Sequence, residues 1–171
     1  MSKALLVIDL QNDYFPDGNF PLWNADGVLR NALNAVSKAQ EDGVPVILIQ
    51  HIADSSKGKA PFFNPDTDGV DVHPDLLAAA PDAPLIVKHF ADGFVGTGLK
   101  ETLAAFGTTE LLVCGMMTQN CVTHTAISKA AEKYAVTVLS DCCTTVTELL
   151  HLIALNALTT RITVAPWSSA L

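Results

Sequence analysis

Hydrophobic residues along this chain gather in short runs, which polar, glycine-rich and proline-rich segments separate. Most of these runs are continuous rather than alternating with polar residues, which predicts strands buried on both faces, as in a parallel sheet. Their length is that of ordinary strands. The expected strands are Lys3–Asp9, Val44–Ile49, Leu85–Lys88, Glu110–Cys114, Val136–Leu139 and Arg161–Val164.

Between these strands, apolar residues recur at the three- and four-residue spacing of amphipathic helices. The clearest case is Gly27–Glu41, which Asp42 and Gly43 end. Strands that alternate with helices predict one α/β domain over residues 1–171, an open, doubly wound, Rossmann-like fold of three layers. Its sheet would be six-stranded and mainly parallel, with helices on both faces. The other expected helices are Asp75–Ala80, Leu99–Phe106, Gln119–Tyr134 and Thr147–Leu158.

Composition and charge exclude several classes of function. The net charge of −8, without a basic cluster, argues against nucleic acid and anionic membranes as partners. The apolar runs are far shorter than the roughly 20 residues that span a bilayer, and no signal peptide is expected at the start of the chain. The 4 cysteines are too few and too unevenly spaced for a disulfide framework. We therefore expect a reduced, cytoplasmic protein.

One candidate nucleophile stands where a buried strand is expected to become a helix. Gly115 ends the strand, Thr118 has the character of a helix N-cap, and Cys121 follows in the first helical turn. Unpaired backbone N–H groups and the helix dipole would both favour the thiolate of Cys121 there. The alternative is that Cys121 is a small buried hydrophobic residue, as free cysteines commonly are.

Two charged residues also lie at the carboxyl ends of expected strands, Asp9 and Lys88. Ligands of open α/β sheets bind beyond the carboxyl ends of the strands, so the fold would bring both residues to the same edge as Cys121. The carboxylate could take the thiol proton, the ammonium could stabilise the charged forms, and the thiolate could attack a carbonyl carbon. Taken singly, Asp9 could be a loop cap and Lys88 a solvent-facing charge.

Three sequence blocks resemble the signature blocks of the isochorismatase-like cysteine hydrolases, in the same order. They are Val7–Phe15 (VIDLQNDYF), Val87–His89 (VKH) and Gly115–Val122 (GMMTQNCV). This superfamily includes nicotinamidases, N-carbamoylsarcosine amidohydrolases and isochorismatases, and the resemblance runs essentially from end to end. It implies a six-stranded parallel sheet and an Asp–Lys–Cys catalytic triad, here Asp9, Lys88 and Cys121.

The resemblance also implies a non-proline cis peptide bond at Met116–Met117. The backbone N–H groups of Met117 and Cys121 would then form an oxyanion hole. The activity that the resemblance favours is hydrolysis of a small amide-type C–N bond through a thioester on Cys121. Two alternatives remain open: a vinyl-ether hydrolase of the isochorismatase type, although members with that activity can lack the cysteine, and a catalytically silent binding protein.

The resemblance bears on metals and partners as well. Nicotinamidase-type members bind a metal through an Asp-x-His motif and a further histidine, and the comparable stretch here, Gln50–Asp54, lacks that motif. We expect neither a metal nor another cofactor, although His51, Asp54 and His73 could still converge. The expected partners are a small-molecule substrate and, because relatives are commonly oligomeric, further copies of the chain in a dimer or larger assembly.

Candidate residues of the substrate pocket follow from their places along the chain. His51 ends its strand, and Phe15 and Phe94 each closely follow a strand that carries a triad residue. Each could instead be ordinary packing under a loop. Further aromatic candidates on nearby loops are Trp23, Phe62 and Phe63.

Overall fold

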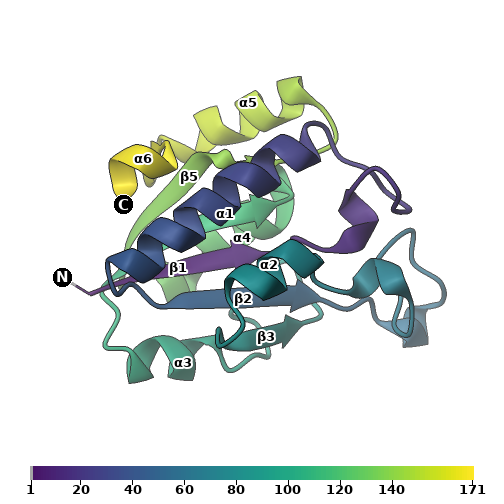
Figure 1. Cartoon of the computed structure of the whole chain (residues 1–171), viewed down its shortest axis with the longest axis horizontal. Helices are drawn as coiled ribbons and strands as arrows, with labels where there is room; N and C mark the ends of the chain where they lie inside the picture. The colour runs from purple at the N-terminus through teal and green to yellow at the C-terminus, as the bar shows by residue number, and fades with distance from the viewer. Residues whose placement is uncertain (1) are drawn as a thin grey trace.

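The computed structural model describes residues 2–171, and its strands form one sheet in the order β3-β2-β1-β4-β5-β6 (Figure 1). Every neighbouring pair of strands is parallel. The predicted six-stranded α/β fold is therefore confirmed, with a fully parallel sheet. The strands are β1 (Lys3–Ile8), β2 (Val46–His51), β3 (Leu85–Lys88), β4 (Glu110–Met116), β5 (Ala135–Thr144) and β6 (Thr163–Ala165).

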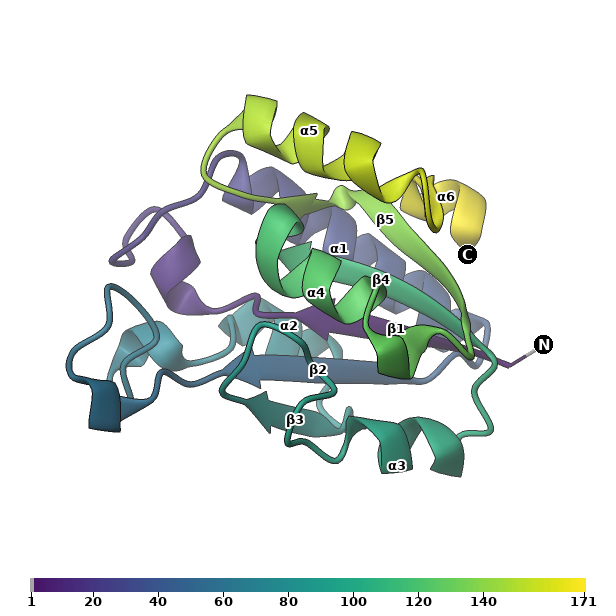
Figure 2. The ribbon, with the colours of Figure 1, turned by 180° about the vertical axis from the view of Figure 1, so that it is seen from behind.

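Helices cover both faces of this sheet. In Figure 1, α1 lies across the front of the sheet, with α2 and α6 against it. Seen from behind in Figure 2, α4 covers β4 and α3 lies beside β3. Within residues 2–171, no helix combines the length and apolar character needed to cross a membrane. The helices are α1 (Ala25–Glu41), α2 (Pro74–Ala79), α3 (Leu99–Ala105), α4 (Thr123–Ala126), α5 (Glu148–Leu158) and α6 (Trp167–Ala170).

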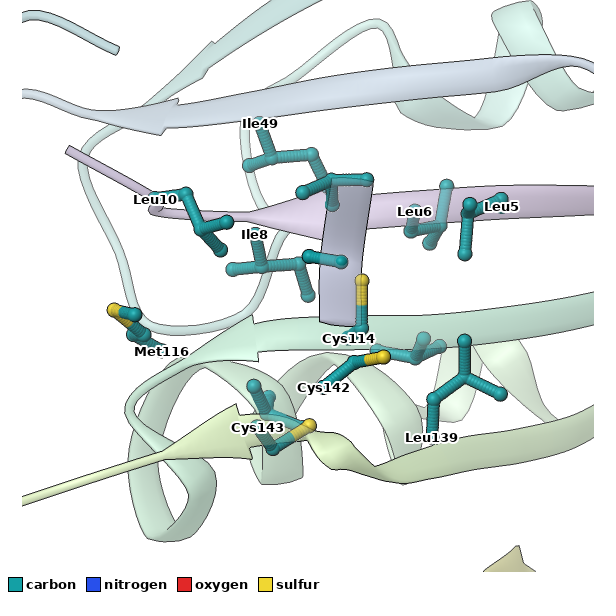
Figure 3. Close-up of a cluster of buried hydrophobic side chains, with 14 of the residues drawn as sticks. Leu5, Leu6, Ile8, Leu10, Ile49, Cys114, Met116, Leu139, Cys142 and Cys143 are labelled. Atoms are coloured by element: carbon teal, nitrogen blue, oxygen red, sulfur yellow. The ribbon is translucent and has the colours of Figure 1, made fainter. Parts of the chain in front are cut away.

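The core is centred on β1, which is paired on both sides. Leu5 pairs with Val46 of β2 and with Leu112 of β4, and the β1 residues from Ala4 to Ile8 are at most 1% exposed. Figure 3 shows apolar side chains of β1 packed among those of β2, β4 and β5. Successive strands run outward from β1 to β3 on one side, and β4 to β6 lie on the other. The carboxyl ends of β1 and β4 thus flank the point where the strand order reverses, the usual ligand site in such sheets.

The prediction of one long helix over Gln119–Tyr134 is wrong. A π-helical turn, Thr118–Val122, leads into the single turn of α4, and a 3₁₀ turn follows over Lys129–Ala131. The side chain of Ser128 accepts a hydrogen bond from the backbone N–H of Ala130 and starts that new turn. Serine and threonine side chains compete for backbone hydrogen bonds in this way, which apolar spacing alone does not reveal.

β5 is longer than predicted: the strand expected to end at Leu139 continues to Thr144. The pairing of β4 with β5 shifts register between Val113 and Gly115. Such an irregularity lets a strand bend and continue beyond the apolar run that identifies it. Both vicinal cysteines, Cys142 and Cys143, are consequently buried in the sheet (Figure 3).

Gly115 is required at the start of the turn that carries Cys121. Its φ angle is 123°, and a Cβ atom at this position would collide with the backbone of Ile8. We predict that Gly115→Ala lowers the free energy of unfolding by about 3 kcal/mol or more, from backbone strain and overpacking. Urea unfolding measures this loss. Gly98→Ala, at an open position, is the control, and an equal effect of the two substitutions would contradict the prediction.

The surface of α5 bears on the expected self-association. Leu149, Leu152 and Ile153 are each more than half exposed, and their spacing places them on one side of the helix. Exposed apolar stripes of this kind occur at protein interfaces. The assembly of this chain into a dimer or larger oligomer stays a prediction.

Candidate active site

The structure brings Asp9, Lys88 and Cys121 together at the carboxyl edge of the sheet. Asp9 directly follows β1, Lys88 is the last residue of β3, and Cys121 lies in the π-helical turn after β4. Asp9 and Lys88 are fully buried, and Cys121 is 4% exposed. Three segments far apart in the sequence thus meet because parallel strands end at a common edge.

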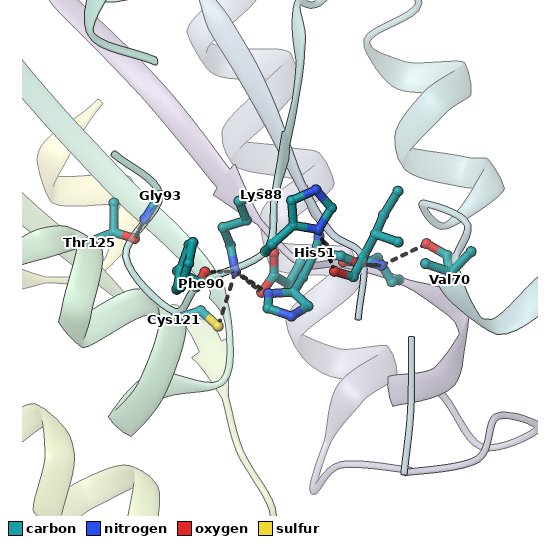
Figure 4. A network of polar contacts seen from close by, with 11 residues as sticks. His51, Val70, Lys88, Phe90, Gly93, Cys121 and Thr125 are labelled. Carbon is teal, nitrogen blue, oxygen red and sulfur yellow. Dashed lines mark hydrogen bonds and ion pairs between the residues drawn. The ribbon is translucent and has the colours of Figure 1, made fainter. Parts of the chain in front are cut away.

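The Lys88 ammonium is the centre of this group (Figure 4). Its Nζ atom lies 2.9 Å from Oδ2 of Asp9 and 3.2 Å from Sγ of Cys121. It also lies 3.0 Å from Nδ1 of His51 and 3.2 Å from the carbonyl oxygen of Phe90. A single buried cation therefore contacts the acid and the thiol at the same time.

One carboxylate oxygen of Asp9 is free to accept a proton. Its Oδ1 atom is buried and has no hydrogen-bond partner within residues 2–171. Burial raises the pKa of Asp9, and the attraction of Lys88 offsets this only in part. Burial acts to lower the pKa of Lys88, but Asp9 and Cys121 together outweigh it, so that pKa is raised and the ammonium persists. The result is a carboxylate with raised proton affinity beside a permanent cation.

The resting form of Cys121 is the thiol, contrary to the thiolate expected from a helix start. Burial raises its pKa well above the ordinary value, the charge of Asp9 raises it further, and Lys88 opposes both. The expected helix dipole is weak here, because only the short α4 follows the turn. The raised pKa keeps Cys121 in the thiol form, so its ionisation requires a close acceptor for the proton.

The turn that carries Cys121 is held from several directions. The peptide bond Met116–Met117 is cis, and the Met117 carbonyl accepts hydrogen bonds from the backbone N–H groups of Asn120 and Val122. The Thr118 side chain does not cap the turn as expected; its Oγ1 lies 2.9 Å from Nδ1 of His151 in α5. Sequence reasoning missed His151, since one histidine among apolar helical residues gives no sign of a distant partner.

A second contact fixes the loop after Lys88. The backbone N–H of Gly93 donates to Oγ1 of Thr125 in α4, with a distance of 2.9 Å (Figure 4). Thr125 is fully buried, and a Cβ on Gly93 would press against it. The segment that follows the lysine is thereby attached to the helix that follows the cysteine.

His51, an expected pocket residue, lies against Lys88. It is the last residue of β2 and pairs directly with Lys88 in the parallel register. Burial, then the charge of Lys88 and then that of His89, together lower the pKa of His51 to about 4. The imidazole is therefore neutral near pH 7, so its Nδ1 can accept a hydrogen bond from the ammonium.

The donor atoms at this site do not fit a metal ion. Ligand atoms of Asp9, His51 and Cys121 lie within 4.8 Å of one another, the only such group in the described part of the chain. The Lys88 ammonium contacts all three, so a second cation would be repelled. Asp54 instead accepts hydrogen bonds from Ser56, and His73 Nδ1 accepts one from the backbone N–H of Asp75, so neither joins His51.

The two predicted pocket phenylalanines have other neighbours. Phe15 packs against His73 with tilted rings whose centroids are 4.5 Å apart, and it lines a cavity of about 620 Å³ whose wall also includes Asp13 and Asp68. Phe94 stacks on Tyr134 at 6.5 Å. Neither contact reaches the triad, and a role for either residue in binding stays a prediction.

Three other aromatic side chains, Tyr14, Phe62 and Phe63, form an aromatic wall beside the site. The Tyr14 ring lies 4.5 Å from Phe63 and 5.2 Å from Phe62, and Phe63 lies 6.1 Å from the ring of His51. Burial raises the pKa of Tyr14, and the nearby charges of Asp9 and Cys121 raise it further. This wall gives the site an apolar side next to its ionic centre.

Comparison with known proteins gives matches over most of the chain. Residues 3–167 match the Isochorismatase domain family. The uncharacterized isochorismatase family protein YddQ of Bacillus subtilis is 40% identical over 147 residues, covering 86% of this chain and 80% of that protein. The nicotinamidase of Escherichia coli is 29% identical over 175 residues, covering 82% of each. A crystal structure of an isochorismatase family protein from Desulfovibrio vulgaris matches with a TM-score of 0.89 at 25% identity, covering 99% of this chain and 96% of that one.

Proposed function

Because the chain belongs to the isochorismatase family, a family of hydrolases, we propose that it cleaves a small amide-type C–N bond through a thioester on Cys121. One observation carries this proposal: the Lys88 ammonium contacts both the Asp9 carboxylate and the Cys121 sulfur. A hydrolase that used water alone would have no use for a buried thiol held against an acid and a cation. The nicotinamidase relative, named for an amide substrate, supports the same bond type.

The first half of the reaction forms the thioester. Asp9 takes the proton of the Cys121 thiol, and the sulfur lone pair forms a C–S bond to the amide carbonyl carbon. The carbonyl π electrons move to oxygen, where the N–H groups of Met117 and Cys121 would stabilise the oxyanion. When the C=O bond re-forms, the C–N bond breaks, and the leaving nitrogen takes the proton from Asp9.

The second half returns the enzyme to its resting state. Asp9 removes a proton from a water molecule, whose oxygen attacks the thioester carbonyl. The second tetrahedral intermediate collapses with cleavage of the C–S bond, and the released sulfur regains a proton from Asp9. Lys88 stays charged throughout and faces whichever partner is negative: Asp9 when its carboxylate holds no proton, or Cys121 when its sulfur is a thiolate.

The raised pKa values make the rate depend on pH. Asp9 must be ionised to accept the thiol proton, and burial raises the pKa of Asp9, so the rate should fall on acidification at a higher pH than for an exposed aspartate. Asp9 and Cys121 interact, so the midpoint belongs to the pair. We would measure kcat/KM from about pH 4 to about pH 9; a rate that stays constant down to pH 4 would exclude Asp9 as the base.

A panel of small primary amides, N-carbamoyl compounds and vinyl ethers tests the function itself. Release of ammonia or amine, or of the carbonyl product of a vinyl ether, would be measured for the wild-type protein and for Cys121→Ala under identical conditions. The proposal expects turnover of at least one amide that depends on Cys121. If only vinyl ethers are cleaved, or if the variant is as active as the wild type, the proposal is wrong.

A further inference from the structure

The Lys88 ammonium has more acceptors than hydrogens to donate. It carries three N–H bonds, yet Asp9, His51, Phe90 and Cys121 each place an acceptor within 3.2 Å of Nζ. In the proposed reaction, Asp9 and Cys121 alternate between neutral and negative forms. The hydrogen bonds to these two groups must therefore strengthen and weaken in turn, and only the contacts to His51 and Phe90 have constant charge.

From this geometry we propose that His51 is a positioning residue, whose Nδ1 accepts a hydrogen bond from Lys88 and keeps the ammonium directed between Asp9 and Cys121 throughout the reaction. This inference rests on the proposed function. His51 would act through Lys88 alone and would exchange no proton with the substrate. Its contribution would appear in the chemical step rather than in substrate binding.

The backbone of His51 is fixed well enough for this role. The Gln11 side chain makes two hydrogen bonds of 2.8 Å with it, donating to the His51 carbonyl and accepting from the His51 N–H. Gln11 is fully buried, and its Nε2 also donates to the carbonyl of Val70 at 2.6 Å. This amide therefore ties the end of β2 to the start of the loop after β1. A substitution of the His51 side chain leaves these backbone contacts available.

The electrostatics favour an acceptor at Nδ1. The groups around the imidazole include Lys88 at the end of β3, then His89 and the carbonyl of Phe90, together with Asp9 and Cys121. A protonated imidazole would face the Lys88 ammonium at 3.0 Å, so the neutral ring with hydrogen on Nε2 fits the site.

Three substitutions of His51 test the inference, one that keeps a hydrogen-bond acceptor and two that remove it. His51→Asn places an amide oxygen close to the position of Nδ1 and restores an acceptor but loses the ring. His51→Phe keeps an aromatic ring against Phe63 but offers no hydrogen-bond acceptor. His51→Leu also removes the acceptor and serves as a second variant if the larger phenyl ring disturbs folding. We expect kcat to fall roughly 10- to 100-fold in His51→Phe and His51→Leu, with KM nearly unchanged, and to stay within about 5-fold in His51→Asn.

A purely structural role predicts the opposite order, because Phe preserves packing better than Asn. An order in which His51→Phe is more active than His51→Asn would therefore overturn the inference. The rate of Cys121 alkylation by iodoacetamide, read by peptide mass, should follow the same order as kcat and needs no substrate. If no amide is hydrolysed but the alkylation order holds, the proposed function fails and the positioning of Lys88 stands.

The hydrogen bond from Lys88 to His51 can also be tested in the wild-type protein, through the tautomer of His51. Nitrogen-15 NMR of the wild-type protein near neutral pH should show an unprotonated Nδ1 and a protonated Nε2 on this ring. A hydrogen on Nδ1 would exclude the bond from Lys88 and contradict the inference, whatever the activities of the variants.

Discussion

Replacing Cys121 with alanine is expected to lower amide turnover by roughly 10⁴- to 10⁶-fold, because the carbon–sulfur bond of the intermediate can no longer form. The fold should remain intact. Cys121 is 4% exposed, and loss of its sulfur leaves only a small space beside Lys88, so the free energy of unfolding should change by about 1 kcal/mol or less. Steady-state kinetics and urea unfolding measure the two effects separately.

The matched control is Cys142→Ala. Cys142 is likewise buried, but its sulfur lies 3.8 Å from Asp141 and packs in the sheet core (Figure 3). Loss of this thiol should leave kcat nearly unchanged and cost some stability, the reverse of the Cys121 result. Residual turnover above a few per cent in Cys121→Ala, on a folded protein, would rule out covalent catalysis.

The second large effect is expected for Lys88→Met. Removal of the ammonium should lower kcat by roughly 10³-fold or more, since the cation that contacts the thiolate while Asp9 holds its proton is lost. The substitution also leaves the Asp9 carboxylate buried without a cation, which typically costs about 3 to 5 kcal/mol of stability. Kinetics and unfolding of the same variant would measure both losses.

The stability loss in Lys88→Met should depend on pH. Burial already raises the pKa of Asp9, and without Lys88 that pKa rises further. A group whose pKa is raised in the folded state contributes stability at low pH and loses that contribution as pH rises through the folded-state pKa. The variant should therefore be closer to wild type in acid than at neutral pH.

A double substitution provides the control for this argument. Asp9→Asn combined with Lys88→Met removes both buried charges and should be more stable than Lys88→Met alone, although equally inactive. If the two substitutions instead destabilise additively, the carboxylate of Asp9 does not depend on Lys88 for its charge, and the ion pair described above is not the main electrostatic interaction of the site.

Much of the fold follows from the sequence for simple reasons. A strand buried on both faces must be apolar throughout, so β1, β2 and β4 are visible as continuous runs, and parallel strands place Asp9 and Lys88 at one edge. Element ends were less predictable. The irregular pairing near Gly115 extends β5 beyond its apolar core, and hydroxyl side chains such as Ser128 divide the segment expected to be one helix.

The electrostatics of the site could not be predicted from residue positions. The thiolate of Cys121 was expected from unpaired N–H groups and the helix dipole, whereas burial and the adjacent Asp9 raise the pKa of the thiol. The contact of His51 with Lys88 depends on the register of β2 against β3, which no local pattern specifies. Burial and register are properties of the assembled sheet, and both decide what the triad can do.

Covalent catalysis requires an acyl group on Cys121 during turnover. Intact-protein mass spectrometry can detect it after acid quenching of the reaction with the amide that is hydrolysed fastest, followed by peptide mapping. We expect a mass increase equal to the acyl group, located on the peptide that contains Cys121 and absent from Cys121→Ala. Turnover without any adduct in the wild-type protein, or an adduct on another residue, would contradict it.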